Sequence, residues 1–316
     1  MPETRSGAQP SSGGIHWDPD RVRSHLGPTG VWANLDALPA SEAVAFARTV
    51  EDLGFGALWV NETTGREPFV MLGALARETD RITLGLGVAA IHARDAVAAH
   101  DGARTVAELS GDRFVMGLGV SHQASAERRG HGYGAPVPAM WAYLDGYDAA
   151  PWTGPAVSDP PLVVAALGDR MLGLAATRSA GAFPFLVTVD QVAHARRVLD
   201  EAAQAAGHAQ RPVLVVSQKA ILGSGPEVRA AARSVVGHFL GRPNYRSSLQ
   251  RGGFDAASIE AVSDPLVDAL VATGTAADLR ARIAAMRAAG ADHVAVIPLS
   301  AEGRQADRAT LRAAAP

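Results

Sequence analysis

The chain has 316 residues and a net charge of −3, set by 29 basic and 32 acidic residues. This balance leaves no basic field to hold a phosphate backbone, so nucleic acid is not an expected partner. Cysteine is absent, which excludes disulfides and thiolate–metal sites. The hydrophobic share of 47% is enough for a large core, and α/β barrels commonly reach this length as one domain.

The first 25 residues are rich in Ser, Gly, Pro and charged residues and contain no apolar run. They are unlike a signal peptide or a membrane anchor, and we expect a poorly ordered tail. No later apolar stretch approaches the length that a membrane-spanning helix needs. The sequence therefore predicts one domain over residues 26–316, a cytoplasmic location and no membrane partner.

Short, nearly continuous apolar runs recur along the rest of the chain. Such runs are typical of parallel strands that helices cover on both faces. The predicted strands are residues 30–35, 57–60, 82–88, 114–119, 162–166, 182–187, 213–219 and 293–298.

Helical patterns fill the gaps between these runs. Residues 41–53 and 95–109 carry apolar side chains at helical spacing and end before Gly54 and Gly111. Three further helix starts are predicted by capping boxes, in which a Ser or Thr and a residue three positions later bond each other's backbone. The boxes are Thr188-x-x-Gln191, Ser224-x-x-Glu227 and Thr275-x-x-Asp278.

Eight strands that alternate with helices predict a single (β/α)8 barrel, with an open doubly wound sheet as the alternative. Two segments fit the repeat poorly, residues 130–159 between the fourth and fifth strands and residues 240–264 between the seventh and eighth. We expect both to be elaborations near the strand ends, where loops carry function.

The third and fourth strands both contain the letters GLGV, at residues 85–88 and 117–120. Glycine weakens a strand, so its presence usually marks a bulge or the close approach of another group. Paired glycines on neighbouring strands suggest a flat ligand lying across the strand ends. Relief of crowding inside the barrel explains them equally well, and the pattern alone does not separate the two readings.

At these residues the chain resembles the bacterial luciferase-like family, and within it the deazaflavin (coenzyme F420)-dependent oxidoreductases. The resemblance covers about residues 30–299 and implies a (β/α)8 barrel with an insertion near strand 7 or 8, usually in a homodimer. The deazaflavin ring would lie at the carboxyl ends of the strands. The matching segments are EDLGFGALWVNE, RITLGLGVAAIHARD, GDRFVMGLGVSH, AALGDRMLGLAA, GRPNYRSSLQRGGF and AGADHVAVIPL.

The resemblance assigns the cofactor ring to a bulge after the third strand. Family members hold a non-prolyl cis peptide there, and the matching pair is Gly87–Val88. Ala89 and Ala90 follow the bulge and would line the ring. Glu62 matches an acidic residue near the pyrimidine edge of the ring, where it would contact the cofactor or take part in catalysis.

The fourth strand runs into Ser121 and His122, which the resemblance also assigns to the cofactor site. His122 falls where a relative has an active-site glutamate, and Ser125 where it has an asparagine that contacts the cofactor. The cofactor phosphate would lie on the loop that opens the helix after strand 5, because free amides and the positive helix end attract an anion. That loop supplies Ala166, Leu167, Gly168, Asp169, Arg170 and Met171.

The candidate substrate residues also lie near predicted strand ends, and each has a plain structural alternative such as core packing or a polar loop. Thr63 stands where the best-known sugar-phosphate-oxidising relative has a catalytic histidine, so a sugar phosphate is a poor substrate prediction. The candidates are Trp32, Thr63, His92, Asn244, Tyr245 and Arg246.

A deazaflavin moves a hydride at its C5, so the protein has to position the acceptor and move a proton. His122 is the candidate proton donor or acceptor, because imidazole titrates near neutral pH. The favoured hypothesis is an F420-dependent oxidoreductase that acts on a small organic molecule, for example at a C=C or C=N bond in secondary metabolism.

Three alternatives stay open. The first keeps the fold but uses FMN, as a luciferase-like monooxygenase. The second is a Schiff-base lyase whose nucleophile would be Lys219, the only lysine in the chain. The third is a binding protein without activity. The histidines lack the tight spacing of a metal site, so no metal is expected.

Overall fold

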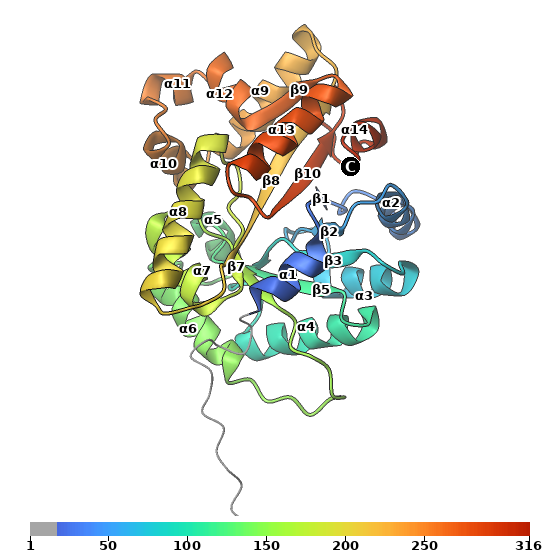
Figure 1. Ribbon diagram of the computed structural model, residues 1–316, viewed down its shortest axis with the longest axis vertical. Coiled ribbons are helices and arrows are strands. Elements are labelled where there is room, and N and C mark those ends of the chain that lie inside the picture. Colours follow the sequence, from blue (N-terminus) through green and yellow to red (C-terminus); the bar gives the residue numbers. More distant parts are fainter. Residues whose placement is uncertain (1–17) are drawn as a thin grey trace, which may run out of the picture.

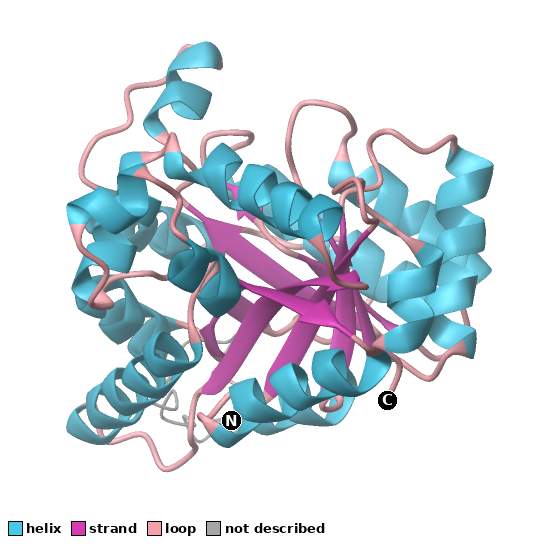
Figure 2. Ribbon diagram, turned by 90° about the horizontal axis from the view of Figure 1, so that it is seen from above, coloured by secondary structure: helices cyan, strands magenta, loops and turns pink. Residues whose placement is uncertain are grey.

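Eight parallel strands close into a barrel in the computed structural model, which describes residues 18–316. The ring runs β1–β2–β3–β5–β6–β7–β8–β10, and β10 pairs with both β8 and β1. Figure 2 shows these strands at the centre of the molecule and the helices around them. The predicted (β/α)8 barrel is confirmed, and the alternative of an open sheet is wrong.

All eight predicted strands are present in the ring, with bounds shifted by a few residues. The strands are β1 Thr29–Ala33, β2 Ala57–Val60, β3 Thr83–Leu86, β4 Ala89–Ala90, β5 Phe114–Gly119, β6 Leu162–Val164, β7 Gly181–Ala182, β8 Val213–Leu222, β9 Val271–Gly274 and β10 His293–Leu299.

The helices follow the strands around the barrel (Figure 1). They are α1 Pro19–Leu26, α2 Ala40–Asp52, α3 Pro68–Glu78, α4 Ala96–Ser110, α5 Gln123–Arg128, α6 Pro136–Asp148, α7 Asp169–Arg178, α8 Val189–Ala205, α9 Pro226–Leu240, α10 Pro243–Arg251, α11 Ala256–Glu260, α12 Asp264–Leu270, α13 Ala276–Ala288 and α14 Arg308–Ala313. None of the helices in residues 18–316 is both long and apolar enough to cross a bilayer.

Two predicted strands end early, and one strand was missed. The run 82–88 stops at Leu86, after which the chain bulges and resumes as β4 beside β5. The run 182–187 keeps only the two residues of β7. Because β7 is so short, the upper half of β8 has a free edge, and the unpredicted β9 pairs with it at Lys219–Leu222.

The helix predictions hold with one exception. The capping boxes at Thr188 and Thr275 are present, with both reciprocal hydrogen bonds. The box at Ser224 is wrong, because α9 begins at Pro226 after Gly225, whose positive φ of 102° sets the chain up for a proline at the first helical position. Residues 130–159 also contain α6, which packs between α4 and α7 and so belongs to the repeat.

The prediction of a poorly ordered tail is wrong for residues 19–25. Residues 19–26 form α1, which Asp18 caps by accepting a hydrogen bond from the backbone of Arg21 at 2.9 Å. Val22 and Leu26 are fully buried against side chains that point into the barrel, so α1 plugs its amino-terminal end. The remaining part of the predicted tail, residues 1–17, lies outside the described residues.

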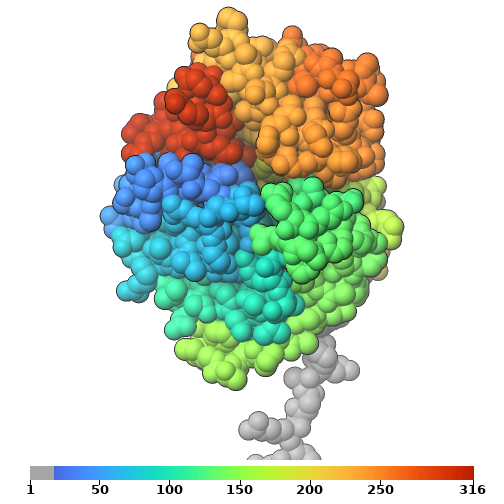
Figure 3. Space-filling view, turned by 180° about the vertical axis from the view of Figure 1, so that it is seen from behind, coloured from blue at the N-terminus to red at the C-terminus, as the bar shows by residue number. Residues whose placement is uncertain are grey.

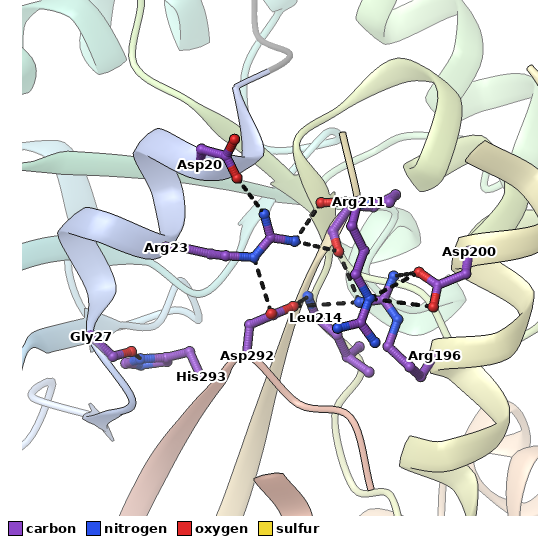
Figure 4. A network of polar contacts seen from close by, with 10 residues as sticks. Asp20, Arg23, Gly27, Arg196, Asp200, Arg211, Leu214, Asp292 and His293 are labelled. Atoms are coloured by element: carbon purple, nitrogen blue, oxygen red, sulfur yellow. Dashed lines mark hydrogen bonds and ion pairs between the residues drawn. The ribbon is translucent and has the colours of Figure 1, made fainter. Parts of the chain in front are cut away.

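A polar network ties this end of the barrel together (Figure 4). Asp292, just before β10, accepts hydrogen bonds from Arg23 Nε at 3.0 Å, Arg196 Nη1 at 3.4 Å and the backbone of Leu214 at 2.8 Å. Arg196 also pairs with Asp200 on the same helix. One carboxylate thus joins α1, α8, β8 and β10 at the amino-terminal end of the barrel.

His293 fills the barrel interior above this network. Its Nε2 accepts a hydrogen bond from the indole of Trp59 at 3.2 Å, which leaves Nδ1 to donate to the carbonyl oxygen of Gly27 at 2.9 Å. Burial lowers the pKa of His293 to about 4, so the ring is neutral and serves as a packing element.

Candidate active site

A cavity of about 850 Å³ opens at the carboxyl ends of the strands. Trp32 from the end of β1, Gly119 from the end of β5 and Tyr245 from α10 lie in its wall. In Figure 3 the orange segment that contains α10 lies beside the green segment that contains α5. The ring of Tyr245 in α10 contacts that of His122, the residue before α5. Barrel enzymes carry out their chemistry at this end, because the loops after the strands converge there.

The fold brings most of the predicted site residues into this one cavity. Those that line it are Trp32, Glu62, Thr63, Gly87, Val88, Ala90, Ser121, His122, Ser125, Ala166, Leu167, Gly168, Met171, Asn244 and Tyr245. Those that do not are Ala89, His92, Asp169, Arg170 and Arg246.

The bulge after β3 forms part of the cavity wall, and its Gly87–Val88 peptide is cis, as the resemblance implied. Two side chains hold it. The indole of Trp32 donates a hydrogen bond to the carbonyl oxygen of Gly87 at 2.5 Å, and Glu62 Oε2 accepts one from the backbone of Ala90 at 2.7 Å. Glu62 is in turn ion-paired with Arg94, so its charge is balanced.

The repeated glycines serve mainly to pack this bulge. A side chain at Gly85 would collide with the ring of Trp59, and one at Gly117 with the carbonyl oxygen of Leu86. At Gly119 it would meet the side chain of Val88 at 2.8 Å. At Gly87 it would meet Phe183 at 3.0 Å and Trp32 at 3.1 Å, so all four positions are crowded, and the crowding at Gly119 arises from the bulge itself.

His122 lies between the end of β5 and α10. It is the N-terminal cap residue of α5, and its ring centroid lies 5.4 Å from that of Tyr245 in an edge-to-face arrangement. Burial lowers the pKa of His122, and the positive charge of Arg242 lowers it further, whereas a hydrogen bond with Asn244 acts in the opposite direction. The neutral imidazole is thus favoured, which suits a group that accepts a proton near neutral pH.

The start of α7 forms the opposite wall. Gly168 precedes the helix with an extended backbone and no side chain caps it. The amide of Met171 donates to the carbonyl oxygen of Gly168, whereas those of Asp169 and Arg170 come too early in the helix for an intrahelical bond. Asp169 and Arg170 are exposed and point away from the cavity, and Asp169 lies 2.8 Å from His194. The cation at this wall is Arg251 of α10, which donates to the carbonyl oxygen of Leu167 at 3.2 Å.

Aromatic rings from three parts of the chain form a continuous wall. Phe185 lies 5.7 Å from Trp32, 6.0 Å from Tyr245 and 5.2 Å from Phe239, measured between ring centroids. All four line the cavity. Such tilted contacts are typical of packed aromatic side chains, and they give this side of the cavity an apolar surface.

Lys219 lies behind this wall and not in the cavity lining. Its Nζ is 4.0 Å from the ring centroid of Phe185 and 4.5 Å from that of Phe239. Burial lowers the pKa of Lys219 to about 7. The residue suggested as a Schiff-base nucleophile thus faces aromatic rings that separate it from the cavity.

His92 and Arg246 have other surroundings. The ring of His92 lies 6.0 Å from that of His131 and 5.9 Å from that of Tyr133, under the loop between α5 and α6. Burial and the charge of His131 lower the pKa of His92. Arg246 donates to Glu260 of α11 at 2.5 Å, so its charge is neutralised outside the cavity.

Sequence reasoning missed several residues of the lining, among them Arg242, Arg251, Phe239 and Tyr133. All of them come from long connections between strands, whose path over the barrel no local pattern reveals.

Within residues 18–316, no group of three or more His, Asp or Glu side chains is arranged to hold a metal ion.

A sequence model of the luciferase-like monooxygenase family matches residues 15–293, so the chain belongs to this family. It is 26% identical to a 5,10-methylenetetrahydromethanopterin reductase of Methanolobus tindarius, over 78% of this chain and 86% of the relative. It is 24% identical to a Mycobacterium tuberculosis protein provisionally named a coenzyme F420-dependent oxidoreductase, over 86% of this chain and 94% of the relative.

A solved structure agrees with the fold. The F420-dependent tetrahydromethanopterin reductase of Methanopyrus kandleri superimposes with a TM-score of 0.73 at 18% sequence identity. The match covers 91% of this chain and 97% of that structure. The likeness in fold therefore extends over most of both chains.

Proposed function

We propose that the protein is a coenzyme F420-dependent oxidoreductase, which transfers a hydride between the deazaflavin and a small organic molecule. Reduction of a C=C or C=N bond is the reaction class we favour. The observation that carries the proposal is the cavity wall at Gly87, Val88 and Ala90, where backbone and small side chains border the open space. The curated relative named for F420 supports the choice of cofactor.

The residues of the cavity fit a planar ring system with a phosphate tail. The bulge offers a surface without large side chains, and Asn61 offers an oxygen that is buried without a partner among residues 18–316. The uncapped start of α7 and the guanidinium of Arg251 suit a phosphate. Val88, Asn61, Gly168 and Arg251 would hold the cofactor.

When bound, F420 supplies a carbon that donates or accepts a hydride. The task of this chain is to position the substrate and to move a proton. His122 is the proposed proton donor or acceptor, because its ring borders the cavity and its pKa is lowered by burial. Glu62 bonds Ala90 and pairs with Arg94, which suits holding the bulge better than moving a proton.

The main alternative is an FMN-dependent monooxygenase, which the family description favours. The same bulge and helix start would suit either tricyclic cofactor. A Schiff-base lyase finds less support, because Phe185 and Phe239 cover Lys219. We also propose a homodimer, for which sedimentation velocity is the test.

Fluorescence titration of the purified protein with F420 and, separately, with FMN tests the cofactor. We expect quenching of F420 at micromolar protein and little response to FMN. Tight binding of FMN without binding of F420 would contradict the proposal. Lys219→Ala serves as the control for the lyase, because a Schiff-base enzyme loses all turnover with this change.

A further inference from the structure

The cavity lining contains more arginine side chains than carboxylates. Its lining includes Arg128, Arg129, Arg242 and Arg251, and its one carboxylate, Glu62, is already paired with Arg94 outside. None of the four arginines forms an ion pair with a carboxylate in the part of the chain that the structure describes. Unpaired guanidinium groups in a recess favour the binding of anions.

Arg242 stands out among the four because of where it is held. Its Nη1 donates to the carbonyl oxygen of His238 at 3.1 Å, and its guanidinium lies 5.6 Å from the ring centroid of Phe239. The ring of Phe239 lies 5.8 Å from that of Tyr245, which in turn contacts the ring of His122. These contacts place Arg242 on the same side of the cavity as His122. One turn further along the same helix, Arg246 is neutralised by Glu260.

A second basic side chain lies against the same aromatic ring, behind the cavity wall, and its pKa of about 7 leaves it only partly charged at neutral pH. Lys219 Nζ is 4.5 Å from the centroid of Phe239, so this ring contacts both Lys219 and Arg242. Aromatic faces attract cations but offset only part of the loss of hydration. Lys219 has no carboxylate in contact in residues 18–316. The side of the cavity near His122 is therefore a positive, partly dehydrated and aromatic surface.

From this arrangement, which rests on the proposed function, we propose that the substrate is an anion with an apolar body, whose carboxylate or similar oxyanion is bound by Arg242 beside His122. The aromatic wall of Trp32, Phe185 and Tyr245 packs the body. A guanidinium suits this role because it donates two parallel hydrogen bonds to a carboxylate. Placing the charge beside His122 brings the reacting bond close to the proton-transfer group.

The cofactor is itself an anion, so some of the arginines of the cavity have to bind the cofactor and not the substrate. Arg251 lies at the start of α7, where a phosphate also meets free amides. Arg129, at the end of α5, donates to the carbonyl oxygen of Thr63 at 3.3 Å. Arg242 lies against the ring of Phe239 in the aromatic wall of the cavity, so we assign it to the substrate.

Calorimetric titration of the F420-loaded protein with cinnamate and with cinnamamide tests the proposal. The two probes have the same shape, and only the acid is charged at neutral pH. We expect cinnamate to bind at least about tenfold more tightly than the amide, as charged hydrogen bonds usually provide. Arg242→Gln should abolish this preference, and Lys219→Met should reduce it.

Arg229→Gln is the matched control, because it removes the same charge from an exposed position on α9 where Arg229 pairs with Asp268. It should keep the full preference, and the F420 affinity of Arg242→Gln should stay within about twofold of the wild type. Equal binding of acid and amide by the wild-type protein, or no binding of the acid, would overturn the proposal.

So would a large loss of F420 affinity in Arg242→Gln, which would assign this arginine to the cofactor tail. If the protein fails to bind F420 at all, the proposed function fails instead. The same titrations on the protein without cofactor then still decide whether the cavity prefers an anion.

Discussion

The two ends of the barrel differ in whether their basic side chains have acidic partners. At the amino-terminal end, Asp292 balances Arg23 and Arg196, and α1 closes the interior. At the carboxyl end, Arg242 and Lys219 share the ring of Phe239 without an acidic partner in residues 18–316. The first arrangement stabilises the fold, and the second leaves Arg242 in the cavity wall, where a ligand can neutralise its charge.

This difference separates residues that serve the fold from those that serve the site. Paired charges at the closed end need no ligand, so their removal should affect unfolding and spare binding. Unpaired buried charges at the open end are unfavourable for folding. Their removal should stabilise the protein and impair function, which is the usual relation between active sites and stability.

The largest expected effect comes from Lys219→Met, which replaces a buried cation by an apolar side chain of similar length. Burial lowers the pKa of Lys219 from 10.5 to about 7, which corresponds to about 5 kcal/mol of lost stability. The facing groups are Phe185 and Phe239, with Arg242 on the latter ring. Urea denaturation at pH 7 should show the variant to be more stable by up to this amount.

The sign of the pH dependence follows from which state binds the proton. Between pH 7 and pH 10.5 the unfolded chain keeps the lysine proton and the folded chain has lost it, so wild-type stability rises with pH. The advantage of Lys219→Met should therefore shrink to about 1 kcal/mol at pH 9.5. Lys219→Arg, which keeps its charge, should be less stable than wild type at both pH values. A pH-independent difference between Lys219→Met and wild type would contradict the assignment.

Asp292→Asn tests the closed end. The change removes one of the two carboxylates that pair with Arg196, which is 5% exposed, and leaves it with Asp200 alone. Breaking a buried pair of this kind costs about 3 kcal/mol. Thermal and urea unfolding should show the loss, while F420 affinity stays unchanged. Asp20→Asn, which removes an exposed partner of Arg23, should cost less than about 1 kcal/mol. Equal losses from the two changes would contradict the proposed network.

His122→Ala tests the open end directly. Loss of a positioned proton donor or acceptor should slow turnover about 100-fold, because general acid–base groups contribute on that scale. F420 affinity should change less than threefold, and the pH–rate profile should lose one limb. Since burial and Arg242 lower the pKa of His122, that limb should fall below the ordinary histidine value. Unchanged turnover would remove His122 from the mechanism.

The sequence was most informative where structure is local or repeats. The eight strands of the ring follow from apolar runs, and the capping boxes at Thr188 and Thr275 locate two helix starts. The short β7 and the added β9 were not predictable, because each depends on what the neighbouring strand leaves unpaired. α1 was missed because its eight residues are rich in polar side chains and give no clear helical pattern. Its helix is stabilised by contact with the barrel interior, which the sequence does not show.

Some residues of the site could likewise be predicted from the sequence, and others could not. Residues next to strand ends, such as Glu62, Gly87 and His122, lie in the cavity where the sequence order placed them. Arg251 and Arg242 lie there because the segment of residues 240–264 folds back over the barrel. No spacing in the sequence predicts that arrangement. Arg170 illustrates the limit, because it adjoins the correct helix start but faces outward.

The smallest expected effect comes from Trp32→Phe, which keeps an aromatic ring but removes the N–H that donates to Gly87. The lost hydrogen bond is worth about 1 kcal/mol, so F420 should bind about fivefold more weakly, with little change in unfolding. Fluorescence titration measures the first and urea denaturation the second. Trp152→Phe is the matched control, because Trp152 also donates to a backbone carbonyl, that of Pro155, in a loop away from the cavity. If both variants bind F420 as the wild type does, the link from Trp32 to the bulge does not affect the cofactor, and the open end is held by Glu62 and Arg94 instead.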